Sequence, residues 1–149
     1  MSIPAFFEDG WLPEGHHQAT WEEIADQFGG VAGSRRAAIL SGLLRWRNAV
    51  RDKGMGGRLI LNGSFISEKS EPGDFDGIFV YNGFSTKLIA LDRDALALVD
   101  NAHCKSYFYG DIWAFSEQAI RDFPQFCRVD GLDRDKVTLR LKGVLEVEV

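Results

Sequence analysis

The chain has 149 residues, of which 45% are hydrophobic, and a formal net charge of −5. This length provides one hydrophobic core, so we expect residues 1–149 to form a single domain without a separate finger or thumb module. No apolar run approaches the ~20 residues that span a bilayer, and the first residues lack a basic segment, so we expect no membrane span, no export signal and a cytoplasmic protein.

Residues 1–19 are predicted to lie extended against the rest of the domain, because the segment Trp11–Gly15 combines an aromatic residue with proline. His16 and His17 follow this segment. Adjacent histidines in a loop are seldom both metal ligands, so we interpret them as surface or capping residues.

Two helices are predicted before the first strand. Thr20 and Glu23 have the Thr-x-x-Glu spacing of a capping box, which indicates a short helix that the Gly29-Gly30 pair ends. Ser34 is suited to cap a longer helix that reaches about Lys53. One face of this second helix should cover a sheet, because it carries apolar residues at helical spacing: Ile39, Leu43, Trp46 and Val50, with Leu40 and Leu44 beside them.

Charge is distributed unevenly along the chain. Residues 1–30 contain six acidic residues and no Lys or Arg, whereas residues 31–58 contain seven basic residues against Asp52 alone. Two interpretations are open: a surface that contacts an anionic partner such as RNA, or a solvated helix face with its arginines outward. The basic residues are Arg35, Arg36, Arg45, Arg47, Arg51, Lys53 and Arg58.

The stretch from Arg58 to Val80 predicts a strand, a turn, a loop and a second strand. The apolar run Leu59–Leu61 stops at Asn62-Gly63-Ser64, and a second apolar run that contains Asp74 and Asp76 follows the polar loop. Side chains alternate along a strand, so the two carboxylates point to the same face. They repel each other unless a cation lies between them, and Mg²⁺ prefers such oxygen ligands. The pattern therefore predicts a magnesium site.

The Gly63-Ser64 turn is a candidate phosphate site. Glycine permits close approach of the backbone, and a free N–H beside a hydroxyl suits a phosphate oxygen. Gly-Ser turns and acidic strand ends also occur without any catalytic role, so the motif gains meaning only from the residues around it.

These residues resemble a known family. Gly63-Ser64, nine residues and then Asp74-Phe75-Asp76 is similar to the Gly-Ser…Asp-x-Asp signature of the nucleotidyltransferase superfamily, the polymerase-beta-like fold. A branch of small bacterial proteins is the closer match. Its members share the following features with this chain: Gly63-Ser64-Phe65, Lys69, Glu71-Pro72, the Asp-x-Asp pair, and upstream Leu12-Pro13-Glu14-Gly15, His17 and Ala19-Thr20-Trp21.

The segment after Val80 supplies a third acid. Asp92 is suited to cap one helix that reaches about Lys105, while the apolar piece 88–91 before it is ambiguous. The aromatic run Tyr107–Phe115 predicts a buried strand, in which the carboxylate of Asp111 is costly unless it is paired or metal-bound. In the resembling superfamily a third carboxylate on a neighbouring strand completes the metal site, and Asp111 is the best match. The rivals look like helix caps or solvated residues: Asp92, Asp94 and Asp100.

The remaining elements carry no predicted chemistry. Ser116 is expected to start a helix that Pro124 bends or ends, and alternating apolar residues over Val137–Val149 predict a strand with Gly143 at a bulge or bend. Two cysteines are too few and too isolated for a disulfide framework or a zinc site, so we expect buried or incidental thiols at Cys104 and Cys127.

The predicted fold class is α/β (α+β), a small mixed sheet backed by helices, similar to a minimal nucleotidyltransferase. The resemblance implies transfer of a nucleoside monophosphate from an NTP, ATP or CTP, to an acceptor hydroxyl, with release of pyrophosphate. It implies that Asp74 and Asp76 hold two Mg²⁺ ions, and that Asp111 binds the ion nearer the acceptor and helps to take its proton. Gly63 and Ser64 would bind the terminal phosphates. Lys69 would add a cation, although a loop lysine is more often solvated.

The acceptor is expected to be a partner protein or tRNA. Comparably small members of the superfamily include halves of bacterial toxin–antitoxin pairs, which modify a tyrosine of the partner protein or the end of a tRNA. The acidic net charge favours the protein acceptor slightly. The alternative is a catalytically inactive nucleotide-binding or partner-binding module. An intact set of three carboxylates argues against this alternative, because clustered acids are costly to keep without a use.

Overall fold

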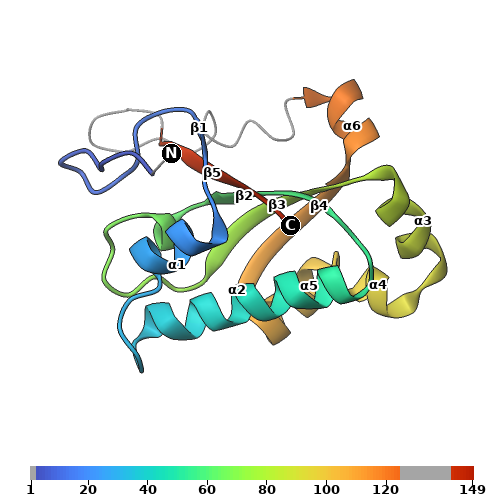
Figure 1. Ribbon diagram of the computed structural model, residues 1–149, viewed down its shortest axis with the longest axis horizontal. Helices are drawn as coiled ribbons and strands as arrows, with labels where there is room; N and C mark the ends of the chain where they lie inside the picture. Colours follow the sequence, from blue (N-terminus) through green and yellow to red (C-terminus); the bar gives the residue numbers. More distant parts are fainter. Residues whose placement is uncertain (1–2, 125–141) are drawn as a thin grey trace.

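The computed structural model describes residues 3–124 and 142–149 as a mixed five-stranded sheet with helices packed against it (Figure 1). This architecture confirms the predicted α/β class. No helix in these two ranges is long and apolar enough to cross a membrane. The strands are β1 (His16–Gln18), β2 (Gly57–Asn62), β3 (Phe75–Tyr81), β4 (Gly110–Ser116) and β5 (Val144–Glu148). The helices are α1 (Trp21–Phe28), α2 (Arg35–Asp52), the 3-10 turn η1 (Ser64–Ile66), α3 (Gly83–Leu91), α4 (Arg93–Ala97), α5 (Asn101–Phe108) and α6 (Glu117–Asp122).

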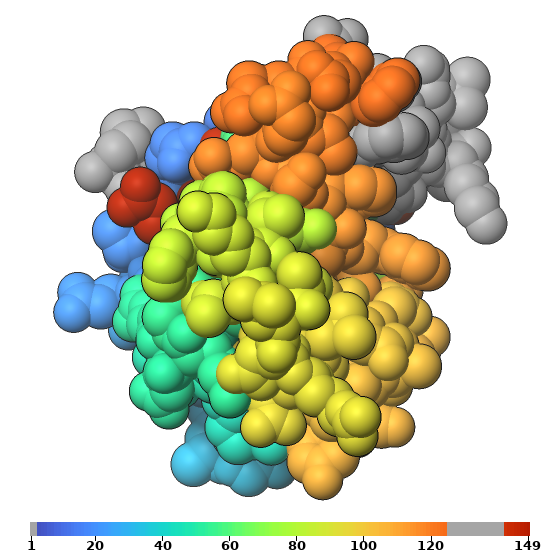
Figure 2. All heavy atoms as spheres, turned by 90° about the vertical axis from the view of Figure 1, so that its right-hand side faces the viewer, coloured from blue at the N-terminus to red at the C-terminus, as the bar shows by residue number. Residues whose placement is uncertain are grey.

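The sheet has the strand order β1-β5-β2-β3-β4, so β1 and β4 are its edges. β2 pairs antiparallel with both β3 and β5, while β3 pairs parallel with β4 and β1 pairs parallel with β5. The parallel pair of β3 and β4 needs a long crossover, which α3, α4 and α5 provide. Seen end-on, α3 and α4 lie below α6 (Figure 2).

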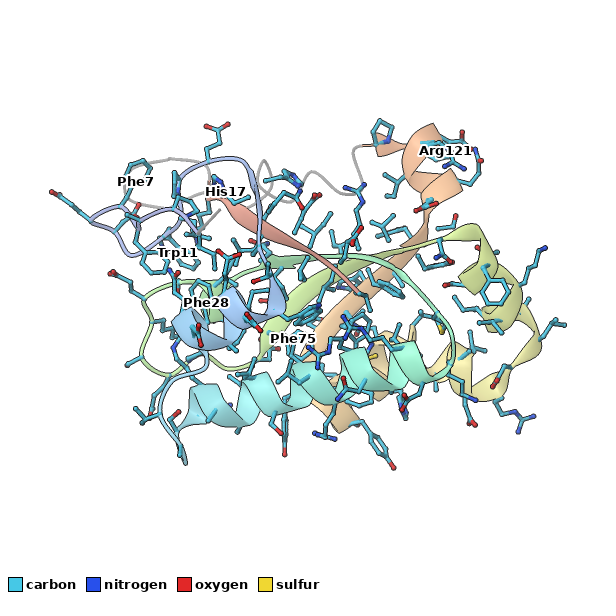
Figure 3. All side chains as sticks on the ribbon, viewed as in Figure 1. Phe7, Trp11, His17, Phe28, Phe75 and Arg121 are labelled. Atoms are coloured by element: carbon cyan, nitrogen blue, oxygen red, sulfur yellow. The ribbon has the colours of Figure 1, made fainter. Side chains whose placement is uncertain are left out.

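One face of the sheet forms the main core with the helices. Phe79 contacts the fully buried Trp46 of α2 edge to face, with ring centroids 5.1 Å apart, and the Trp46 indole donates a 3.0 Å hydrogen bond to the carbonyl of Leu98. Figure 3 shows Phe28 and Phe75 between the sheet and this helix layer. The predicted apolar face of α2 is confirmed, since these residues are buried: Ile39, Leu43, Trp46 and Val50.

The opposite face, called here the outer face, carries the alternate side chains of the same strands. Its apolar part is a smaller cluster in which Ile120 of α6 joins residues of the strands. Figure 1 shows α6 on this side of the sheet, away from α2. The buried members are Ile60, Ile78, Val80, Ile120 and Val144. Residues of even number in β2 and β3 therefore point to the outer face.

Local capping signals are confirmed at four helices. Thr20 and Glu23 form the predicted capping box of α1. Ser34 caps α2 by accepting from the N–H of Ala37, and Ser116 caps α6, which ends before Pro124. Asp92 caps α4 through the N–H groups of Asp94 and Ala95. Each cap satisfies N–H groups that the first helical turn leaves without partners.

Two predicted boundaries are wrong, and one segment left open is resolved. The single helix from Asp92 to about Lys105 is two helices, because the chain breaks at 98–100 and Asp100 caps the second one. The ambiguous piece 88–91 belongs to α3, which Asn82 caps. The strand expected at Tyr107 begins at Gly110, because α5 continues to Phe108 and Tyr109 has a left-handed conformation with φ 60°.

The N-terminal segment joins the sheet through β1. His16 and His17 lie in this strand and not in a loop, and the His17 ring contacts the carbonyl of Pro13 at 2.7 Å. Figure 3 shows Trp11 and His17 in this N-terminal segment. Gly143 precedes β5 and forms no bulge; a side chain there would collide with the Pro13 carbonyl. The predicted strand positions 137–141 lie outside the described residues.

Cys104 is confirmed as a buried thiol, and burial raises its pKa to about 12. Cys127 lies outside the described ranges, so the expectation for it stays a prediction.

Candidate functional site

Three polar side chains form a row across three neighbouring strands on the outer face. Asp76 of β3 is in register with Asn62 of β2 and with Asp111 of β4. Asp76 has the same parity as Ile78 on the outer face, and Asp111 alternates with Ile112, which is in the main core. Adjacent strands are about 4.8 Å apart, so these side chains are direct neighbours. We call Asn62, Asp76 and Asp111 the carboxylate row.

Asp74 lies two residues before Asp76 and directly precedes β3. Its pKa is raised, first by burial of the carboxyl group and second by the negative charge of Asp111. Lys105 and Arg35 oppose this rise with their positive charges. The structure therefore places Asp74 within electrostatic reach of Asp111, which neighbours Asp76, and it adds two cations near Asp74.

Gly63 lies directly against the row. It has φ 80°, a conformation that favours glycine, and a Cβ atom at this position would overlap the Asp76 carboxylate. The turn η1 follows at once. The Ser64 hydroxyl has no hydrogen-bond partner in the described part of the chain. The close approach at Gly63 is thus to the carboxylate of the Asp-x-Asp motif, and the predicted approach to a phosphate stays a prediction.

Arg36 holds the loop between the two halves of the motif. Its guanidinium donates hydrogen bonds to the carbonyl oxygens of Phe65 (2.7 Å), Ser67 (2.7 Å) and Lys69 (2.5 Å). Five N–H donors in a fixed planar arrangement make arginine suited to this role. Lys69 itself is exposed, and its ammonium has no partner among residues 3–124 and 142–149.

Arg35 holds the other end of the same loop by donating to the carbonyl oxygens of Pro72 (2.8 Å) and Gly73 (2.9 Å). The first two residues of α2 therefore position the whole segment from Gly63 to Asp74.

The rest of the basic segment also makes intramolecular contacts. Arg45 donates to the Tyr107 carbonyl at 3.0 Å, and the Arg47 guanidinium lies 5.0 Å from the centre of the Trp21 ring. The arginines of α2 do point outward, and Arg35, Arg45 and Arg51 are exposed, but most of them also contact other parts of the chain. Lys53 and Arg58 form ion pairs with Asp92 (2.9 Å) and Glu146 (2.7 Å).

Asn101 supports the row from the first turn of α5. Its amide donates hydrogen bonds to the Asp111 carboxylate at 2.5 Å and to the Ile112 carbonyl at 3.0 Å. The sequence analysis missed this residue. A polar residue directly after the capping Asp100 was the available signal, but nothing local indicated that it faces β4.

The donor set fits Mg²⁺. Carboxylate and amide oxygens are the ligands that this hard ion prefers, and one or two carboxylates with substrate phosphates are its usual protein site. The Asn62 Oδ1 atom is buried without a hydrogen-bond partner in the described part of the chain, so it is an available oxygen beside Asp76. Within residues 3–124 and 142–149, however, no three His, Cys, Asp or Glu side chains are close enough together to hold one ion by themselves.

The rival acids have structural roles, as predicted. Asp92 and Asp100 cap α4 and α5, and Asp94 lies 3.5 Å from the Lys53 ammonium. A recess of about 460 Å³ lies at the other end of β2, and no member of the carboxylate row lines it. Its polar lining includes Gln18, Arg58, Asn82, Glu117 and Glu146.

A family model described as a family of unknown function, DUF6932, matches residues 4–148, so the chain belongs to this family. Comparison with curated proteins and with solved structures gives no match.

Proposed function

We propose that this member of DUF6932 is a Mg²⁺-dependent nucleotidyltransferase, which transfers a nucleoside monophosphate from an NTP to an acceptor hydroxyl. The observation that carries the proposal is the carboxylate row beside Gly63: two acids from neighbouring strands share a face, and a glycine lies against one of them. Acids so close together repel each other, and Mg²⁺ with a triphosphate removes this repulsion.

Asp74, Asp76 and Asp111 would hold the metal ions, with the Asn62 oxygen next to them. When bound, Mg²⁺ supplies positive charge that neutralises the phosphates and the charge that develops at the α-phosphorus. The Ser64 hydroxyl and the exposed ammonium groups of Lys69 and Lys105 are candidate contacts for the terminal phosphates.

Asp111 is the proposed proton acceptor. Asn101 donates a hydrogen bond to one oxygen of the Asp111 carboxylate, which holds the group in one orientation. The second oxygen can then accept the proton of the acceptor hydroxyl. The acceptor oxygen forms a bond to the α-phosphorus, the bond from that phosphorus to the pyrophosphate oxygen breaks, and pyrophosphate leaves. The alignment of the reacting groups supplies most of the remaining catalysis.

A partner protein is the favoured acceptor, and tRNA is the other. Six cations of the basic segment contact other residues of the chain, and these contacts compete with binding to an RNA backbone. A toxin–antitoxin setting in the cytoplasm and ATP or CTP as donor belong to the same proposal, on the basis of the resemblance alone.

The test is to incubate the purified protein with each of the four radiolabelled NTPs, Mg²⁺ and host lysate, and to ask whether label enters protein or RNA. The variant Asp76→Asn is the control, because it preserves shape and removes one charge of the row. Transfer that depends on Asp76 and Mg²⁺ supports the proposal. An equal absence of transfer in wild type and variant, with all four NTPs, contradicts it.

A nucleotide-binding or partner-binding module without catalysis is the second candidate. It is favoured by one observation: no three acids among the described residues are arranged around a single ion position. Binding of an NTP with Mg²⁺ but without transfer to any acceptor would select this candidate.

A further inference from the structure

Trp113 is an exposed aromatic residue in the middle of an edge strand. Its exposed fraction is 57%, whereas Ile78, its neighbour on β3, is buried. It lies in register with Ile78, which is in register with Ile60. Trp113 and Asp111 share the outer face, because residues two apart on a strand point the same way. A flat indole surface therefore adjoins the carboxylate row.

The outer face is thus divided into two parts suited to the two parts of a nucleotide. The polar part contains the carboxylate row and the Gly63-Ser64 turn, while the cations Lys105 and Arg35, on helices of the main-core side, act on Asp74 where the chain enters β3. The aromatic part begins at Trp113, two residues after Asp111 on β4. At the rise per residue of a strand this separation is about 6.6 Å. In an NTP the base is joined to the α-phosphorus through a single ribose, so it must land close to the metal-bound phosphates.

We propose that the base of the donor NTP stacks on the indole of Trp113. This inference rests on the proposed function. The base is a better occupant than a ring of the acceptor, because every NTP carries a base tied to the reacting phosphorus, whereas an acceptor needs only a hydroxyl. Stacking on an aromatic face tolerates any base, so several NTPs should be donors.

The test measures binding by isothermal titration calorimetry with two probes, MgATP and inorganic tripolyphosphate with Mg²⁺. Tripolyphosphate carries the phosphates without a base. The variants are Trp113→Ala and Trp113→Phe, and Phe84→Ala on α3 is the matched control, since Phe84 is another exposed ring (62%) on an element outside the row. Thermal melting confirms that each variant folds.

The expected result is that Trp113→Ala weakens MgATP binding about 5- to 150-fold, the range for loss of one base–aromatic stack. Binding of tripolyphosphate should not change, and Trp113→Phe and Phe84→Ala should bind MgATP nearly as the wild type does. Unchanged MgATP binding by Trp113→Ala overturns the inference, even if acceptor labelling is lost, since Trp113 would then serve the acceptor. Equal weakening of both probes also overturns it. Wild-type protein that binds no NTP would contradict the proposed function itself.

Discussion

The Asn101 amide donates a 2.5 Å hydrogen bond to the Asp111 carboxylate, and through this contact the start of α5 fixes an acid on the edge strand β4. The same amide donates to the Ile112 carbonyl of this edge strand. One side chain therefore sets the orientation of the carboxylate and also satisfies a backbone group of the edge.

Replacing Asn101 should cost both stability and activity. Asn101→Ala removes a hydrogen bond to a charged group, so we expect a loss of about 1–3 kcal/mol in the free energy of unfolding, measured with urea. Asn101→Asp should be worse at neutral pH, because it places a second carboxylate against Asp111. The control is Asn48→Ala, whose side chain contacts only the exposed Arg47 guanidinium and should change stability by less than about 0.5 kcal/mol. Equal effects at both positions would contradict the supporting role of Asn101.

Asp74→Asn should stabilise the ligand-free protein in a pH-dependent manner. Burial and the charge of Asp111 raise the pKa of Asp74, so the folded protein holds this proton more tightly than the unfolded chain does. The stabilisation that comes from this tighter proton binding is complete at pH values below the unfolded-state pKa of about 3.8, and it is lost as pH rises through the folded-state pKa. The advantage of the variant should therefore be absent below pH 3.8 and grow as pH rises toward neutrality. Urea unfolding across this range measures it, and an advantage that shrinks with rising pH would refute the argument.

Gly63→Ala should destabilise the protein more than its conformation alone requires. A residue with a side chain at φ 80° costs about 1–2 kcal/mol, and here the added Cβ also collides with Asp76. Gly33→Ala is the matched control, because Gly33 has φ 81° and a Cβ there meets no atom within 4 Å. The difference between the two losses in unfolding free energy isolates the contact with Asp76. If the two variants lose the same amount, Gly63 is needed only for its turn.

Arg36→Lys should loosen the motif loop although the charge is kept. A lysine cannot bind three carbonyl groups in one plane, so we expect a loss of at least about 2 kcal/mol and faster hydrogen exchange at residues 63–69. Arg51→Lys on the same helix should have little effect, since the Arg51 side chain makes no hydrogen bond or ion pair within the described part of the chain. Unaltered exchange in the loop of Arg36→Lys would show that other contacts hold it.

Mg²⁺ and NTP together should raise the melting temperature of the wild type. At a ligand concentration of 100 times Kd the gain is about 2.7 kcal/mol, which corresponds to about 5–10 °C for a chain of this size. Asp76→Asn should lose this shift, because the site then lacks one of its charges. Differential scanning fluorimetry measures it, with EDTA as the control for metal dependence. A shift of the same size in the variant would remove Asp76 from the site.

The sequence by itself determined the local features of this protein. The caps at Thr20, Ser34 and Ser116 depend on contacts within one helical turn, and the outer-face position of Asp76 follows from the alternation of a single strand. Such features involve only neighbours along the chain, so spacing alone predicts them. Asp74 precedes β3, so its predicted common face with Asp76 stays a prediction.

Only the tertiary structure decided which distant residues meet. The register of Asp76 with Asp111 depends on how the crossover lays β4 beside β3, and a shift of one residue would turn Asp111 into the core. The sequence predicts Arg36 as a surface residue of a helix, and only the packing of the loop against it creates its hydrogen bonds to the loop carbonyl groups. The break before α5 leaves the Leu98 carbonyl to accept the Trp46 indole, a buried contact between residues 52 positions apart. Each of these outcomes depends on packing between segments that are remote in the chain, and no local propensity encodes it.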